Sequence, residues 1–269
     1  IRSKHQLVGE MSVLQQLVEL SVRLSAFIHE SQKERGATGV FLGSKGEKFR
    51  TELSSQRALT DKQVVALNAV LERIDAEQFG VRFKNLLDTA RHDYYDKLAQ
   101  HRAAVDALSI AGPDGISFYT KMHAALLDVV TYVSSLSTNA DLSSRIVAYV
   151  NFLKVKEYTG IERAVGATTF AAGQFANFEE FSKFAGLIPT QDAYLKVFFA
   201  LVTEEQKTFY TNTLKGRAVE EAARMRQIAL RSMDTKDMGG VEGSVWFQTM
   251  TEKINLMKEI EERLSSDLL

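Results

Sequence analysis

The chain has 269 residues, of which 45% are hydrophobic and 25% charged, a composition typical of a folded protein and too apolar for a disordered one. Its 33 lysines and arginines balance 34 aspartates and glutamates, which argues against binding nucleic acid or anionic lipid by bulk electrostatics. The absence of cysteine excludes disulfides, thiolate metal sites and cysteine nucleophiles.

Helical periodicity runs along nearly the whole chain, which contains only two prolines, Pro113 and Pro189. The breaks between periodic segments predict about eight helices, at 4–43, 48–75, 80–109, 114–138, 141–173, 190–213, 215–235 and 243–267. Short connections between long amphipathic helices are typical of antiparallel bundles. We therefore expect an all-α fold of two juxtaposed antiparallel four-helix bundles, whose helices need not divide in sequence order.

The first expected helix carries a seam of residues at alternating spacings of three and four, from Leu7 through Met11 to Leu42. This spacing places the members of the seam on one face of the helix, as in a coiled coil. The seam is apolar at its start and polar towards its end, where Arg35 and Thr38 occupy positions expected to face inward.

Two later helices repeat this feature. The helix expected at 141–173 carries Arg163 on its inward stripe, and the helix expected at 215–235 carries Arg226. Two similar segments are rich in small residues, Glu34–Phe41 and Glu162–Phe170. Each begins with Glu-Arg, which contains Arg35 or Arg163, and ends in phenylalanine. Glycines in both segments permit the close approach of another helix or a ligand. Three helices thus each place an arginine where a hydrophobic residue is expected.

Arginine suits the capture of a small planar anion because its guanidinium is permanently charged and carries five N–H donors in a fixed fork. Arginines that converge inside a bundle repel one another unless an anion lies among them. Thr38, Thr168 and Thr169 lie within a turn of the arginines, so their hydroxyls are candidates to complete the ligand shell. Capture of this kind requires neither histidine nor metal.

A structural role for the arginines is the main alternative. Glu34 and Glu162 are available for buried ion pairs, but adjacent residues on a helix do not face each other. Each glutamate would therefore need an arginine from another helix as its partner. A stripe arginine can also bury only its stem and keep its charged end in water.

Other kinds of chemistry find no support in the sequence. The five histidines lack metal-ligand spacing, and no phosphate-binding loop, nucleophile elbow or zinc-protease motif occurs. We therefore expect no catalytic residue, no metal, no cofactor and no enzymatic activity.

Three segments resemble the signature helices of NIT domains, the nitrate- and nitrite-sensing modules of bacterial signalling proteins. The segments are Gln32–Leu42, Lys156–Ala164 and Val245–Asn255. The resemblance covers nearly the whole chain and implies two four-helix bundles with an anion held between them. Carried over by position, the anion contacts are Arg35, Arg163 and either Arg226 or Arg224, of which helical periodicity favours Arg226. The first signature often carries more than one basic residue, whereas Glu34 precedes Arg35 here.

The resemblance also implies a biological setting. Such domains usually lie outside the inner membrane in receptors such as chemoreceptors and histidine kinases, although some control RNA-binding output domains. We therefore expect residues 1–269 to form one sensory module of a longer, homodimeric receptor. This periplasmic module would meet the membrane only through flanking segments and would have no nucleic-acid partner. It would transmit the binding of nitrate or nitrite as a shift of its first helix against its last. The alternatives are a sensor of another small anion or carboxylate, and a helical interaction module with structural arginines.

Overall fold

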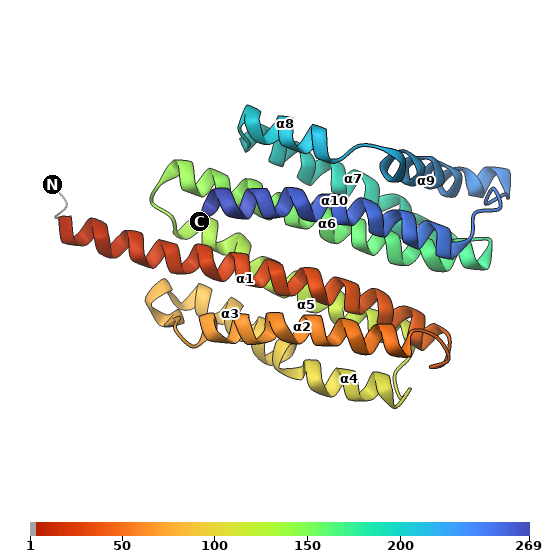
Figure 1. Ribbon diagram of the computed structural model, residues 1–269, viewed down its shortest axis with the longest axis horizontal. Coiled ribbons are helices and arrows are strands. Elements are labelled where there is room, and N and C mark those ends of the chain that lie inside the picture. Colours follow the sequence, from red (N-terminus) through yellow and green to blue (C-terminus); the bar gives the residue numbers. More distant parts are fainter. Residues whose placement is uncertain (1–3) are drawn as a thin grey trace. The chain divides into compact units, whose positions relative to one another are not determined.

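The computed structural model describes residues 4–269, and the side chains of residues 12–269, as helices and their connections, without a strand in that part of the chain (Figure 1). It divides into two compact units, residues 1–146 with 268–269, and residues 147–267. The expected all-α fold of two four-helix bundles is confirmed.

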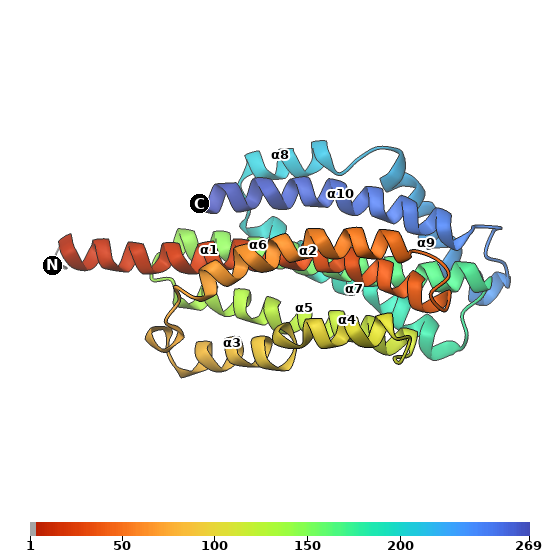
Figure 2. The same ribbon diagram turned by 60° about the horizontal axis from the view of Figure 1, so that its bottom comes forward.

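The first unit is a bundle around the long first helix. Its helices are α1 (Lys4–Gly43), α2 (Arg50–Leu71), α3 (Val81–Asp93), α4 (Leu98–Asp106) and α5 (Gly112–Leu136). Helix α1 packs against α2 and α5, and the three lie side by side in Figures 1 and 2. The expected seam of α1 is buried at Val18, Leu24, Ile28, Arg35 and Thr38. The side chains of Leu7 and Met11 lie outside the described residues.

The helix expected at 80–109 is interrupted between α3 and α4 by a 3-10 turn, Tyr95–Lys97. The buried ring of Tyr95 meets Phe27 of α1 edge-on, with the ring centroids 5.2 Å apart. Its hydroxyl donates to Oδ1 of Asn68 in α2 at 2.9 Å. These contacts anchor the interruption to two other helices, and because they are made at long range, the local periodicity does not reveal it.

The second unit has the same plan. It contains α6 (Ala140–Ala172) from Val147 onward, α7 (Phe178–Leu201), α8 (Glu204–Thr213), α9 (Arg217–Thr235) and α10 (Gly243–Leu268). A cluster of large side chains forms its core: Phe170, Phe175, Phe184, Met225, Trp246 and Met250. Of the aromatic residues after α6, Phe175 and Phe184 are therefore packing residues, whereas Phe178 is exposed.

The expectation of a loop up to Pro189 is wrong, because α7 already begins at Phe178 and runs through this proline. Oδ1 of Asn177 accepts a hydrogen bond from the Glu180 backbone N–H at 2.9 Å, and the Glu180 carboxylate accepts one from the Ala176 N–H at 2.6 Å. This reciprocal capping is a strong helix start. This capping outweighs the tendency of Pro189, further along the chain, to break a helix.

Helices α6 and α10 approach each other closely at Gly166. A Cβ atom on Gly166 would overlap the indole of Trp246, which is fully buried. Nε1 of this indole donates to the backbone carbonyl of Arg163 at 3.0 Å. The glycine therefore lets α10 place its indole against the turn of α6 that carries Arg163.

Candidate anion-binding site

Arg35 is buried in the first unit, with 1% of its surface exposed. Its Nη1 donates to Oγ1 of Thr120 at 3.0 Å and lies 3.4 Å from Nδ1 of His123, both on α5. Nε2 of His123 lies 2.8 Å from Oγ of Ser31, whose hydroxyl donates to the Ile28 carbonyl. Because the Ser31 proton is used in that bond, the network assigns His123 the neutral tautomer protonated on Nε2. Nδ1 is then an acceptor for the guanidinium.

Glu34 faces a different side of α1 and has its own partners. Its carboxylate is fully buried and accepts hydrogen bonds from Nε and Nη2 of Arg102, both at 2.7 Å. It also accepts one from the Tyr119 hydroxyl at 2.8 Å. Burial and the charge of Glu34 raise the pKa of Tyr119, so the phenol remains a donor. Glu34 therefore ties α1 to α4 and α5.

Arg163 is buried in the second unit in a similar arrangement. Its Nη1 donates to Oγ1 of Thr251 on α10 at 3.0 Å. Its guanidinium carbon lies 4.7 Å from the centre of the Phe247 ring, a cation–π distance. A hydroxyl and an aromatic face of one helix thus orient this guanidinium.

Glu162 is fully buried and forms the ion pair of the second unit. Its carboxylate accepts from Nε and Nη2 of Arg226 at 2.6 and 2.7 Å, and from Nε2 of Gln191 at 2.7 Å. Arg226 therefore has a carboxylate partner on another helix, which is the structural role that the sequence leaves open.

The two units carry one pattern at nearly the same spacing. Each has a Glu-Arg dipeptide whose carboxylate pairs with an arginine 64 or 68 residues later. The arginine of the dipeptide donates to a threonine 85 or 88 residues later. The members are Glu34, Arg35, Arg102 and Thr120, and Glu162, Arg163, Arg226 and Thr251. Sequence reasoning found the dipeptides and missed both threonines, because each threonine faces its arginine from another helix and no local pattern marks it.

The other predicted site residues differ in exposure. Arg224 is exposed and pairs with Glu221, three residues earlier on α9. Thr168 is exposed, and its hydroxyl donates to the Val165 carbonyl of its own helix. Thr38 is fully buried on α1, one turn beyond Glu34. Of these three residues, only Thr38 shares a buried face with a candidate arginine.

Lys253 of α10 is a further cation that sequence reasoning missed. Its side chain is partly buried, and no hydrogen bond or ion pair of its own occurs among the described residues. Burial, with repulsion from Arg226, lowers the pKa of Lys253 from 10.5 to about 8, against the attraction of Glu162. The lysine therefore carries its charge at pH 7 at a cost to stability.

Replacing Lys253 by methionine should stabilise the protein at pH 7 and have less effect as the pH rises from 8 to 10.5. Below pH 8 the folded protein keeps the ammonium partly buried, whereas above it the folded protein loses this proton before the unfolded chain does. The lowered pKa corresponds to a gain of at most about 3 kcal/mol in the free energy of unfolding, and partial exposure of the side chain to solvent reduces this gain. Urea unfolding of both proteins at pH 7 and pH 10 measures the effect, and an equal difference at both values would contradict it.

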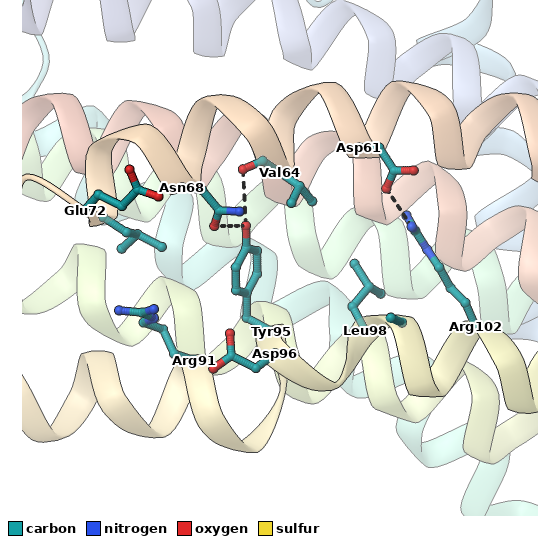
Figure 3. A pocket seen from close by; sticks show the side chains of 11 residues that line it. Asp61, Val64, Asn68, Glu72, Arg91, Tyr95, Asp96, Leu98 and Arg102 are labelled. Carbon is teal, nitrogen blue, oxygen red and sulfur yellow. Dashed lines mark hydrogen bonds and ion pairs between the residues drawn. The ribbon is translucent and has the colours of Figure 1, made fainter.

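A groove of about 510 Å³ lies between α2 and the α3–α4 segment (Figure 3). Figure 3 shows Tyr95 at the centre of the groove, hydrogen-bonded to Asn68, and Arg102 near one end, hydrogen-bonded to Asp61. Burial and the nearby Asp96 raise the pKa of Tyr95 to about 12. Three carboxylates line the groove, those of Asp61, Glu72 and Asp96. They outnumber the two arginines of the lining, Arg91 and Arg102, and disfavour an anion, so we do not place the anion site here.

Comparison with known proteins gives consistent matches. A family model described as nitrate and nitrite sensing matches residues 26–269. The nitrate regulatory protein of Klebsiella oxytoca is 28% identical over 261 residues, which are 97% of this chain and 64% of that protein. The chain therefore spans about two thirds of that relative. The solved structure of the NasR transcription antiterminator matches with a TM-score of 0.86 and 27% identity, over 97% of this chain and 69% of that one.

These relatives correct three expectations. One relative is a transcription antiterminator, which acts on transcription, so the expectation of no nucleic-acid partner is wrong. The expected attachment to a membrane through flanking segments is wrong as well. The expected periplasmic position in an inner-membrane receptor is wrong for the same reason. Among the described residues, no helix has the length and apolar character to cross a bilayer.

Proposed function

Because the chain belongs to the nitrate- and nitrite-sensing family, we propose that it is a non-enzymatic sensor domain that binds nitrate through Arg35 and Arg163. The observation that carries this proposal is the repeated geometry, in which each unit buries one arginine and orients it with a threonine hydroxyl. A guanidinium offers paired N–H donors to two oxygens of a planar oxyanion. Its charge does not depend on pH in the physiological range.

Arg226 is the third arginine of the proposal. Glu162 and Gln191 engage its Nε and Nη2, so Nη1 is the donor that it would direct to an anion. Arg224 and Thr168 are dropped from the proposed contacts because both are exposed. Thr38 is retained as a nearby hydroxyl on α1.

Transmission of the signal is proposed to use α10. Arg163 contacts this helix through Thr251 and Phe247, so an anion that pulls on the guanidinium also acts on α10. The anion must bind one arrangement of α6 and α10 more tightly than the other, and a difference of about 1–3 kcal/mol is typical of such coupling.

Thermal unfolding with nitrate, nitrite, acetate and chloride at matched ionic strength tests the proposed ligand. Nitrate at about one hundred times its Kd should add roughly 2.7 kcal/mol to stability, whereas chloride should add much less. Arg163→Met should abolish the shift caused by nitrate. The control Arg224→Met alters an exposed arginine of α9 and should keep the shift. Equal small shifts with all four salts would overturn the proposal.

A further inference from the structure

Thr120 and Thr251 have the same hydrogen-bonding role in the two units. The Thr120 hydroxyl donates to the Ile116 carbonyl at 3.3 Å, and the Thr251 hydroxyl donates to the Phe247 carbonyl at 2.7 Å. Each proton is thus used on the carbonyl four residues earlier, and each oxygen presents its lone pairs to an arginine Nη1 at 3.0 Å. The threonines are acceptors held by their own helices.

The contacts of each guanidinium include the threonine and a second group, and together they act on its plane as well as on its position. The hydrogen bond of each threonine hydroxyl to the carbonyl four residues earlier holds its oxygen in place, so this oxygen is a fixed acceptor. Arg35 has a second acceptor in Nδ1 of His123 at 3.4 Å. Arg163 has the face of Phe247 at 4.7 Å. Loss of the threonine oxygen removes a fixed acceptor from each guanidinium and weakens the constraint on its plane.

The plane of a guanidinium matters only for some anions. Nitrate is planar, and two of its oxygens meet two N–H groups only when the planes are aligned. Chloride is a sphere and responds to the charge of the arginine without regard to the plane of the group. On the basis of the nitrate site proposed above, we infer that Thr120 and Thr251 are positioning residues that determine its selectivity for a planar oxyanion over a spherical one.

Isothermal titration of Thr120→Val and Thr251→Val with nitrate, with chloride as competitor, tests this inference. Valine preserves the shape of threonine and removes the acceptor oxygen. Each variant should weaken nitrate binding about tenfold, or about 1.4 kcal/mol, and change chloride binding less than twofold. The serine variants keep the hydroxyl and should restore nitrate binding.

Thr60→Val is a matched control. Thr60 is fully buried on α2, and its hydroxyl donates only to the carbonyl of Gln56 among the described residues. This variant loses a buried hydroxyl away from the arginines and should leave both affinities unchanged.

The outcomes separate this inference from the proposed function. A wild-type protein that does not bind nitrate overturns the nitrate site itself. If the wild type binds nitrate and the valine variants keep its Kd within twofold, the positioning role is wrong. Equal losses of nitrate and chloride binding also overturn it, because they would show that the threonines support the fold of the site and not the orientation of the guanidinium.

Discussion

Replacing Glu162 by glutamine is expected to lower the free energy of unfolding by about 3–5 kcal/mol, because it leaves the partly buried Arg226 without its counterion. The Glu162 carboxylate is fully buried and accepts two short hydrogen bonds from Arg226. It also attracts Lys253, which Arg226 repels. A neutral amide leaves these two cations facing each other. Urea unfolding at pH 7 measures the loss.

The equivalent change in the first unit, Glu34→Gln, should cost less than half as much. Arg102 there also donates to Asp61 at 2.6 Å, so it retains a carboxylate when Glu34 is neutralised. Glu221→Gln removes an exposed ion pair with Arg224 and should leave stability nearly unchanged. Losses of the same size for Glu162→Gln and Glu221→Gln would show that the buried pair does not hold the second unit together.

The helices could be predicted from the sequence because their periodicity is local. The expected helix 4–43 corresponds to Lys4–Gly43 and the expected helix 243–267 to Gly243–Leu268. The predicted helix boundaries are wrong where a long-range contact or a helix cap outweighs the periodicity. Tyr95 interrupts the third helix through contacts with α1 and α2, and Asn177 starts α7 well before Pro189.

The candidate site was predictable only in part. Helical spacing placed Arg35 and Arg163 on inward faces, and both are buried. The same geometry showed that a glutamate cannot pair with the arginine next to it, but not which helix supplies the partner. That choice depends on how helices separated by more than 60 residues pack, as for Glu34 with Arg102. Thr120 has no local signal, because its role comes only from facing Arg35 across the bundle.

A second buried ion pair joins α6 to α10 and should produce an effect as large. Lys156 donates to the carboxylate of Glu261, and each residue is 1% exposed. Nζ of Lys258 donates to the same carboxylate at 2.9 Å. Burial opposes the charge of Glu261, but the two lysines outweigh it and hold the pKa of this carboxyl below its ordinary value. Burial also lowers the pKa of Lys156.

Glu261→Leu should lower the free energy of unfolding by about 3–5 kcal/mol, because it removes the carboxylate that Lys156 contacts in the interior. The double variant Lys156→Met/Glu261→Leu should be more stable than this single one, because apolar side chains of similar volume replace both buried charges. Urea unfolding of the wild type, both single variants and the double variant forms a double-mutant cycle. Glu259→Leu, at an exposed position of α10, is the control for the substitution itself. A double variant whose loss equals the sum of the single losses would mean that the two charges do not interact in the folded protein, and that α6 and α10 are held together by apolar packing alone.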